Sequence, residues 1–314
     1  MVVACRIAAN RRSTVLLLVA VLVAVLVGIT PAHAPGLVAG GAHARARAVV
    51  PPDFDHAVVL VLENKEYDAV IGNSDAPYLN GLADGAGLAT RFYGIRHPSL
   101  PNYLALLGGS TFGITSDCTS CVARGRSLVD QLDAHGITWK GYMGGMPSAC
   151  YTGATYGRYA KKHNPFMYFP SITGDAARCA QVQPLTKLNA DLKAGSLPRF
   201  AFVSPDLCAD MHDCSVASGD LYLSHLIPRI LLALGTDGVL FVTFDEGSTS
   251  AGCCTVAKGG HIATIVAGPA VSAPVRSSVP YDLYSILRTI EEAWNLPLLR
   301  NAGCECTSSM TAFF

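Results

Sequence analysis

The sequence of 314 residues has no excess of charge of either sign, because 23 lysines and arginines balance 23 aspartates and glutamates. Charged residues make up only 15% of the chain, whereas hydrophobic residues make up 50%. The balanced charge argues against a nucleic-acid-binding scaffold, which depends on attraction to phosphates, and the apolar content argues against a disordered chain. The chain also lacks internal repeats and low-complexity segments. We therefore expect a folded domain with a packed core.

The sequence also lacks an apolar run of the roughly 18 residues that a membrane-spanning helix needs. An apolar run over residues 15–29 follows three arginines and precedes two sites of small residues, Ala32-His33-Ala34 and Ala42-His43-Ala44. This pattern predicts a secretory signal peptide over residues 1–44. The protein is then secreted to the extracellular space and has no stable membrane insertion after cleavage. An uncleaved leader that anchors the protein to the membrane is the alternative.

Cysteine is abundant, with 11 in the chain, of which Cys5 lies in the predicted signal peptide. In a chain bound for an oxidising compartment we expect the others to form disulfides. We expect local bonds, and the candidate pairs are Cys118 with Cys121, Cys208 with Cys214, Cys304 with Cys306, and, farther apart, Cys150 with Cys179. The adjacent Cys253 and Cys254 pair either with each other or with two distant partners. No second C-x-x-C motif is present to complete a zinc site.

Short apolar runs alternate with amphipathic segments from residue 55 onward, after a predicted linker over residues 45–54. We predict strands over residues 57–62, 200–203, 239–244 and 262–267. We predict helices over residues 76–83, 100–107, 128–135, 185–193, 219–234 and 281–294. Continuous runs rich in Val, Ile and Phe are typical of buried parallel strands. The alternation predicts an α/β fold, with one domain over residues 55–314 in which a mostly parallel sheet is sandwiched between helices.

Acidic side chains follow three of the predicted strands. Glu63 and Asn64 follow the first, Asp206 follows the second, and Asp245 and Glu246 follow the third. Ligands of parallel sheets bind at the edge where the carboxyl ends of the strands meet. Carboxylates crowded at that edge repel one another and favour a divalent cation. We therefore predict one or more divalent metal ions here, with Zn, Fe, Mn, Mg or Ca all compatible; solvated loop acids are the alternative.

Ser99 directly precedes the predicted helix over residues 100–107, and its position has two interpretations. It is either the N-cap of the helix or a nucleophile. Unpaired N–H groups and the positive dipole at a helix N-terminus suit a phosphoryl group. Four histidines in polar loops, His97, His163, His212 and His261, are further candidates for site residues.

A set of motifs occurs in a fixed order between residues 55 and 300. They are Glu63-Asn64-Lys65-Glu66-Tyr67-Asp68, Asp75-Ala76-Pro77-Tyr78-Leu79, His97-Pro98-Ser99-Leu100-Pro101-Asn102-Tyr103, Lys162-His163-Asn164-Pro165-Phe166, Asp210-Met211-His212-Asp213 and Phe244-Asp245-Glu246-Gly247 followed by Gly260-His261. In this order they resemble the secreted bacterial phosphoesterase family of acid phosphatases and non-haemolytic phospholipases C, a branch of the alkaline phosphatase superfamily. The resemblance implies an alkaline-phosphatase-like fold and a phosphoric ester hydrolase.

The resemblance also implies roles for individual residues. The implied metal ligands are Glu63, Ser99, Asp245 and Glu246. The implied catalytic residues are Ser99, His163, His212 and His261, and the implied substrate-binding residues are Asn64, His163 and His212. The sequence departs from the family pattern at Lys65-Glu66, where many members have His-Ser, and at Asp206, where Asn is expected.

These observations predict a secreted, metal-dependent acid phosphatase that acts on small phosphomonoesters through a phosphoserine at Ser99. A histidine that protonates the leaving group favours mildly acidic pH. A phosphodiesterase or phospholipase C-like enzyme is one alternative, although the sequence has no basic amphipathic helix for lipid surfaces. A non-catalytic secreted binding protein of the same fold is the other.

Overall fold

The computed structural model describes residues 50–314, so the predicted signal peptide over residues 1–44 and the first part of the predicted linker lie outside the described residues. Residues 50–54 form neither helix nor strand. Phe54 is nevertheless buried, and its carbonyl accepts a hydrogen bond from the Trp294 indole N–H at 3.1 Å. The chain is therefore packed against the domain from Phe54 onward.

A nine-stranded sheet forms the centre of the described chain, in the order β10-β2-β9-β8-β1-β7-β3-β6, with β11 paired to β2. Its strands are β1 (Ala57–Leu62), β2 (Gly87–Tyr93), β3 (Trp139–Met143), β6 (Val182–Pro184), β7 (Phe200–Ser204), β8 (Val239–Phe244), β9 (His261–Ala267), β10 (Val275–Ser277) and β11 (Tyr281–Asp282). In this sheet β9 alone runs antiparallel to its neighbours, and the remaining pairs are parallel. A separate hairpin joins β4 (Thr155–Tyr156) to β5 (Tyr159–Ala160). The predicted mostly parallel sheet is confirmed.

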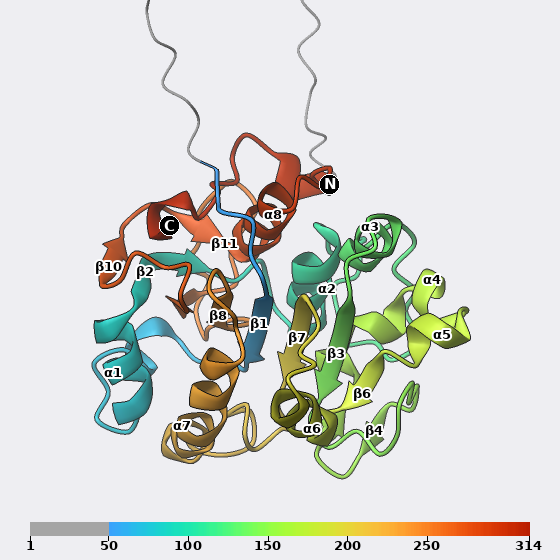
Figure 1. Cartoon of the computed structure of the whole chain (residues 1–314). Coiled ribbons are helices and arrows are strands. Elements are labelled where there is room, and N and C mark those ends of the chain that lie inside the picture. Colours follow the sequence, from blue (N-terminus) through green and yellow to red (C-terminus); the bar gives the residue numbers. More distant parts are fainter. Residues whose placement is uncertain (1–49) are drawn as a thin grey trace, which may run out of the picture. The chain divides into compact units, whose positions relative to one another are not determined.

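Helices cover both faces of this sheet (Figure 1). One face carries α1 (Pro77–Gly85), α6 (Thr186–Ala194) and α7 (Val216–Leu232). The other carries α2 (Leu100–Gly108), α3 (Leu128–Ala134), α4 (Pro170–Thr173), α5 (Ala176–Cys179) and α8 (Leu283–Ala293). Connections between parallel strands of one sheet are right-handed. The chain moves across the sheet in one direction through α2 and in the opposite direction through α1, α6 and α7, so α2 lies on the face opposite to those three helices. Within residues 50–314 no helix is both long and apolar enough to cross a bilayer.

Short 3-10 helices occupy several of the connections. They span Tyr67–Ala69, Lys161–His163, Pro165–Tyr168, Arg300–Gly303 and Thr311–Phe313. The helix Lys161–His163 leads directly from the β4–β5 hairpin toward the carboxyl edge of the sheet, where the predicted site residues lie.

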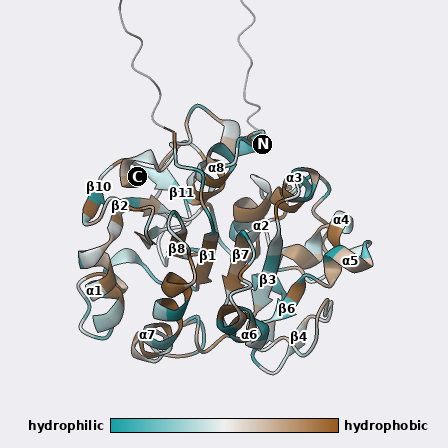
Figure 2. Ribbon diagram, in the orientation of Figure 1, coloured by the Kyte–Doolittle hydropathy of each residue, from teal (hydrophilic) through white to brown (hydrophobic). Residues whose placement is uncertain are grey.

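The core is centred on β1 and its two neighbours, β7 and β8. Every residue of these three strands is buried, and Figure 2 shows the three ribbons in the hydrophobic colour. Burying a Val, Leu or Phe side chain stabilises a fold by about 1.5–3 kcal/mol. These continuous apolar runs therefore fix the middle of the sheet, and with it the positions of the residues that follow each strand.

Two predicted elements differ in the structure. The strand at residues 262–267 was expected to be parallel, but β9 is antiparallel to β8 and β2. The helix predicted over residues 281–294 begins only at Leu283, because Tyr281 and Asp282 pair with β2 as β11. The Asp282 carboxylate then caps the helix by accepting a hydrogen bond from the Tyr284 N–H at 3.0 Å.

The described cysteines form five disulfides. The pairs are Cys118–Cys121, Cys150–Cys179, Cys208–Cys214, Cys253–Cys254 and Cys304–Cys306. The predicted local pairing is confirmed, and the open question about the adjacent cysteines is answered by their bond to each other. Disulfides of this number are typical of proteins in oxidising compartments.

Candidate active site

The predicted acidic residues meet at the carboxyl edge of the sheet. Glu63 directly follows β1, and Asp245 directly follows its parallel neighbour β8. The Glu63 N–H donates to the Asp210 carbonyl at 2.9 Å, which brings the loop after β7 to the same place. Because β9 is antiparallel, its first residue, His261, also lies at this edge. Three loops and the start of one strand therefore surround a single location.

The Ser99 hydroxyl lies between two carboxylates at this location. Its Oγ donates a hydrogen bond to Glu63 Oε2 at 3.0 Å and lies 3.4 Å from Glu246 Oε1. Asp245 Oδ1 accepts a hydrogen bond from the Asn64 N–H at 3.1 Å, whereas its buried Oδ2 has no hydrogen-bond partner. The structure thus brings together the predicted metal ligands and the predicted phosphate-binding residue.

The carboxylates of this cluster repel one another in a buried setting. Glu63 and Asp245 are fully buried, and Glu246 is 5% exposed. Burial and the neighbouring charges of Glu63 and Glu246 hold the pKa of Asp245 well above its usual range. Burial also raises the pKa of Glu246 to about 7, although the His97 imidazole opposes the shift. A cation would offset this repulsion and give the unpartnered Asp245 oxygen a ligand role.

His163 is buried between two carboxylates. Its Nε2 lies 3.2 Å from Glu63 Oε1, and its Nδ1 lies 3.3 Å from Asp210 Oδ2. Burial disfavours the charged imidazolium, but the two carboxylates outweigh that effect and raise the pKa of His163 to about 10. The ring also stacks on Tyr103, with the centroids 5.3 Å apart. His163 therefore links Glu63 to Asp210 and favours the charged form of the Glu63 carboxylate.

His212 has a different environment, because its side chain is 28% exposed. Its Nδ1–H donates to Asp213 Oδ1 at 2.6 Å. Its Nε2 lies 3.3 Å from the Lys162 ammonium, which has only donors, so Nε2 carries the lone pair. The ring centroid is 5.6 Å from that of His163. Ligand atoms of Glu63, His163 and His212 lie within 4.8 Å of one another, so these residues also form a group suited to a metal ion.

His261 does not join the cluster through its ring. The ring stacks on Tyr67 with the centroids 4.4 Å apart, and its Nε2 lies 3.0 Å from the Thr90 carbonyl oxygen. Among residues 50–314, no hydrogen bond or ion pair links this ring to the carboxylates of the cluster. The geometry therefore gives no support to a catalytic role for His261 and assigns it a contact with the neighbouring strand.

The family resemblance implied no role for His97, but the structure places its imidazole against Glu246. Its Nδ1 lies 2.5 Å from Glu246 Oε2, and its Nε2 lies 2.8 Å from the Thr249 carbonyl oxygen. The imidazole therefore orients Glu246 from the side opposite Ser99. The two residues are 149 positions apart in the chain, so only the folded topology reveals the pair.

The start of α2 lacks two features expected from the sequence, a side-chain cap from Ser99 and unpaired N–H groups in the first turn. Ser99 occupies the N-cap position of the helix, but its side chain makes no capping hydrogen bond. The first N–H groups of the helix are nevertheless occupied: the Leu100 N–H donates to Asp117 Oδ1 at 2.9 Å, and those of Asn102 and Tyr103 donate to the Ser99 carbonyl. The proline between them has no N–H. No N–H group of residues 100–103 is therefore free for a phosphoryl group, whereas the Ser99 N–H has no hydrogen-bond partner within the described residues.

Several residues of the site were not assigned a role from the sequence, and Tyr103 and Asn102 are the clearest. The Tyr103 hydroxyl donates to Glu63 Oε1 at 2.5 Å. Asn102 Oδ1 accepts hydrogen bonds from the N–H groups of Ile95 and Arg96, which fixes the loop that leads to Ser99. Both residues follow Ser99 by three or four positions, the spacing that places helix residues on one face. This spacing from Ser99 was the feature of the sequence from which both residues could have been assigned to the site.

The Lys65-Glu66 pair, which departs from the family pattern, lies outside the carboxylate cluster. The Lys65 ammonium donates to the Met211 carbonyl at 2.8 Å, in the loop after β7. The Glu66 carboxylate accepts hydrogen bonds from the Thr249 hydroxyl at 2.8 Å and from the His261 N–H at 2.9 Å. The Lys65-Glu66 segment after β1 is therefore hydrogen-bonded both to the loop after β7 and to the loop after β8.

Asp206 also lies outside the cluster, although its position after β7 placed it among the predicted edge acids. Its Oδ1 accepts hydrogen bonds from the N–H groups of Cys208 and Ala209, at 3.0 and 3.1 Å. Asp206 therefore closes the turn that begins the Cys208–Cys214 loop. Asp210, four residues later, is the acid of this loop that contacts His163.

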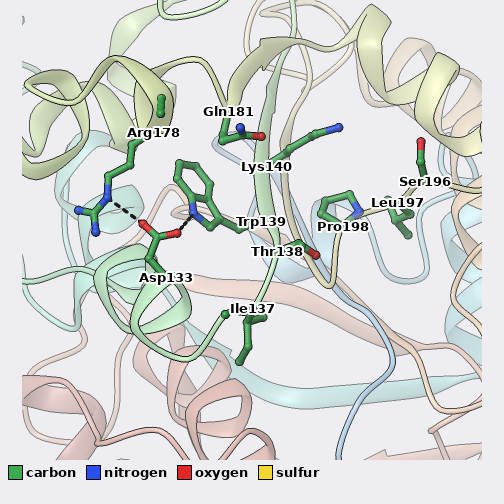
Figure 3. A pocket seen from close by; sticks show the side chains of 12 residues that line it. Asp133, Ile137, Thr138, Trp139, Lys140, Arg178, Gln181, Ser196, Leu197 and Pro198 are labelled. Carbon is green, nitrogen blue, oxygen red and sulfur yellow. Dashed lines mark hydrogen bonds and ion pairs between the residues drawn. The ribbon is translucent and has the colours of Figure 1, made fainter.

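A cavity of about 620 Å³ lies away from this site. Figure 3 shows Asp133 between Trp139 and Arg178, and the Asp133 carboxylate accepts from Trp139 Nε1 and Arg178 Nε at 2.8 Å each. The lining residues Thr138 and Pro198 precede β3 and β7, so the cavity opens at the amino edge of the sheet. None of the predicted site residues lines it. The cavity is therefore separate from the chemistry described above.

Comparisons with known proteins identify the group to which this site belongs. The profile of the Phosphoesterase family matches residues 72–297. A phosphatidylinositol-3-phosphatase of Mycobacterium tuberculosis is 32% identical over 252 residues, which cover 78% of this chain and 79% of that protein. A phosphate-repressible acid phosphatase of Penicillium chrysogenum is 31% identical over 264 residues, which cover 80% of this chain but only 61% of that protein.

The solved structures show the same fold at low sequence identity. A protein of the alkaline phosphatase superfamily from Vibrio parahaemolyticus superposes with a TM-score of 0.55 at 13% identity, covering 82% of this chain and 71% of that one. The predicted alkaline-phosphatase-like fold is thereby confirmed. From its family profile, its relatives and this fold, the chain belongs to the Phosphoesterase family, whose members are phosphoric ester hydrolases.

Proposed function

We propose that the protein is a secreted, metal-dependent acid phosphatase that hydrolyses small phosphomonoesters, with Ser99 as the nucleophile. The observation that carries the proposal is the Ser99 hydroxyl, held 3.0 Å from Glu63 and 3.4 Å from Glu246 in a buried cluster of carboxylates. The acid phosphatases among the relatives support the substrate class. A signal peptide over residues 1–44 and a single catalytic domain over residues 55–314 are parts of the same proposal.

The residues of the cluster fit a divalent cation. Glu63, Asp245, Glu246 and the Ser99 oxygen would hold it, and the unpartnered buried Asp245 Oδ2 is the atom that most needs such a partner. Oxygen ligands of this kind suit Mg, Ca or Mn, and a histidine contribution also allows Zn or Fe. When bound, the cation acts as a Lewis acid toward a phosphoryl oxygen and lowers the pKa of the serine hydroxyl.

The protein's own side chains can carry the steps of transfer. Ser99 Oγ attacks phosphorus in line, so that the Oγ–P bond forms as the bond from phosphorus to the leaving alkoxide breaks. The serine proton passes to Glu63 Oε2, which already accepts the Ser99 hydroxyl at 3.0 Å. His212, which pairs with Asp213 through Nδ1, takes a proton from solvent and gives it to the leaving alkoxide. Water then attacks the phosphoserine and releases phosphate by the reverse sequence.

Asn64 and His163 prepare the site for these steps. Asn64 has a left-handed backbone conformation with φ of 56°, and its Nδ2 lies 3.3 Å from Glu63 Oε2, beside the Ser99 oxygen. From there its amide can donate to a phosphate oxygen. The His163 imidazolium keeps the Glu63 carboxylate oriented and offsets part of the negative charge that collects as the phosphoryl group arrives.

The experiment that tests the proposal measures product release by the mature protein between pH 4 and 9, with and without a chelator. The substrates are p-nitrophenyl phosphate, bis-p-nitrophenyl phosphate and phosphatidylinositol 3-phosphate, the last because of the mycobacterial relative. We expect monoester hydrolysis that is lost on chelation and in the Ser99→Ala variant. The matched control is Ser224→Ala, because Ser224 bonds only within α7, to the Leu221 carbonyl.

Preference for the diester would contradict the monoesterase assignment and favour the phosphodiesterase alternative. Full turnover by the Ser99→Ala protein would contradict the role of Ser99. A lack of hydrolysis of all three substrates with added Zn, Mn, Mg, Fe or Ca would favour a binding protein of this fold.

A further inference from the structure

Lys162 lies beside His212 at the edge of the site but has no role in the proposal above. It belongs to the 3-10 helix Lys161–His163 and directly precedes the buried His163. Its ammonium lies 3.1 Å from Asp117 Oδ2 and 3.3 Å from His212 Nε2. In the described part of the chain, no other lysine or arginine pairs with either of these two side chains.

Asp117 links this ammonium to the nucleophile. While its Oδ2 pairs with Lys162, its Oδ1 accepts the Leu100 N–H at 2.9 Å, the first N–H after Ser99. A single carboxylate therefore separates the Lys162 charge from the peptide that carries the nucleophile. On its other side the same ammonium contacts the histidine that we propose as the proton carrier.

The Lys162 ammonium provides positive charge near a bound phosphomonoester, which the first turn of α2 does not provide. A phosphomonoester brings up to two negative charges to a cluster that already contains several carboxylates. The leading N–H groups of α2 are occupied by Asp117 and by the Ser99 carbonyl, so they cannot offset that charge. A side-chain cation adds to the stabilisation from the proposed divalent cation, in a site where these helix N–H groups cannot contribute.

Lys162 keeps its charge in this position. The Asp117 carboxylate, 3.1 Å away, stabilises the ammonium form. An ammonium has three N–H donors, and Asp117 and His212 accept two of them. The third remains for a substrate oxygen, and the side chain is 23% exposed, so it can be reached.

We propose that Lys162 is a further catalytic residue that binds a non-bridging phosphoryl oxygen and favours phosphomonoester dianions over diester monoanions. The proposal rests on the proposed function, since it concerns the same transfer to Ser99. A diester has one negative charge fewer and replaces one free oxygen with an ester oxygen. Contact with Lys162 therefore stabilises the transfer of a monoester more than that of a diester.

The test compares Lys162→Met and Lys162→Arg with Lys161→Met in the full mature protein supplied with its cation. Lys161 is the matched control, because it is adjacent and equally half-buried, but its ammonium donates to the Thr119 carbonyl and lies over the Tyr168 ring. Two quantities are measured: kcat/KM for p-nitrophenyl phosphate and for bis-p-nitrophenyl phosphate, and the binding of inorganic phosphate by calorimetry.

We expect Lys162→Met to lower kcat/KM for the monoester on the order of 100-fold, the usual cost of removing one preorganised donor to a transition state. We expect a loss of less than about 10-fold for the diester. Lys162→Arg should recover part of the loss, phosphate binding should weaken in Lys162→Met, and Lys161→Met should match the wild type.

Equal losses for the two substrates, or unchanged phosphate binding in Lys162→Met, would overturn the inference while leaving the proposed function intact. A wild-type protein that hydrolyses neither substrate would contradict the proposed function, and the phosphate-binding comparison would then decide the role of Lys162 on its own. Circular dichroism of each variant checks that the fold is retained.

Discussion

Tyr103 donates a hydrogen bond to Glu63 Oε1 at 2.5 Å while Ser99, four residues earlier, donates to Oε2 of the same carboxylate at 3.0 Å. The two donors flank the first turn of α2, and the N–H of Tyr103 also donates to the Ser99 carbonyl. One helix face therefore fixes both oxygens of Glu63. The orientation of the nucleophile and that of the adjacent carboxylate are coupled through this face.

Replacement of Tyr103 by Phe tests this coupling. The variant keeps the ring that stacks on His163 but removes the donor to Glu63. Hydrogen bonds to charged groups contribute about 1.5–3 kcal/mol, so we expect kcat/KM to fall roughly 10-fold or more with the fold retained. Steady-state kinetics and a thermal melt measure the two effects. Wild-type activity in this variant would show that Glu63 does not depend on Tyr103.

Replacement of Asp245 by Asn tests the metal site through stability. In the chelated protein at pH 8 we expect the variant to be more stable than the wild type, because Asn cannot take on the negative charge that burial beside Glu63 and Glu246 disfavours, and it keeps the acceptor for the Asn64 N–H. With added Mn²⁺ or Zn²⁺ we expect the wild type to gain melting temperature and the variant to gain much less.

The control for Asp245→Asn is Asp68→Asn, because Asp68 is an exposed acid that follows the same end of the sheet. Its melting temperature should respond to the cation as the wild type does. A chelated Asp245→Asn protein that is less stable than the wild type, together with an unchanged response to the cation, would contradict the assignment of Asp245 as a ligand.

Glu66 offers a test of how the loops are held. Its carboxylate accepts from the N–H groups of Ser248, Thr249 and His261 and from the Thr249 hydroxyl. Glu66→Ala should loosen the loop that positions Glu246 and lower kcat/KM at least several-fold. Glu66→Gln keeps an acceptor and should retain more activity, and Asp68→Ala should have no effect. Hydrogen exchange of residues 246–249 measures the loosening directly, and unchanged exchange would contradict it.

Glu291 gives a pH dependence of stability that is independent of the active site. It is fully buried on α8, and burial raises its pKa from 4.5 to about 8, although the Leu299 N–H donates to it. Because the folded state favours the protonated acid, this contribution to stability is complete below about pH 4.5 and is lost as the pH rises toward 8.

Urea unfolding at pH 5 and pH 8.5 tests this sign. Glu291→Gln lacks the titration, so we expect its free energy of unfolding to rise relative to that of the wild type by more than about 1 kcal/mol between the two pH values. Glu305→Gln, at an exposed position, should follow the wild type. A difference between Glu291→Gln and the wild type that does not change with pH would contradict the raised pKa.

The central strands were predictable because both of their faces are buried. β1 and β8 have the bounds that their apolar runs predict. β2 was missed because Thr90 and the exposed Arg91 interrupt its apolar pattern. β3 was missed because it includes Lys140, whose charge is accommodated by Asp191 at 2.7 Å. Strands that contain polar residues paired with distant partners lack the continuous apolar run by which the other strands were predicted.

The site was predictable only as far as topology determines it. Glu63 and Asp245 follow adjacent parallel strands, so their meeting follows from the order of the sheet. The ring direction of His261 depends on packing against Tyr67, and the pairing of His97 with Glu246 depends on two loops. Contacts of this kind are set by tertiary packing, and no spacing in the sequence reports them.

The most direct test of the central claim is to trap the phosphoserine. The cation-loaded protein is mixed with p-nitrophenyl phosphate at the acidic end of its activity range and quenched in acid within milliseconds, and its peptides are then analysed by mass spectrometry. We expect one phosphoryl group on Ser99 in the wild type and none in Ser99→Ala. Turnover by the wild type without a phosphorylated Ser99, or with the phosphoryl group on another residue, would contradict it.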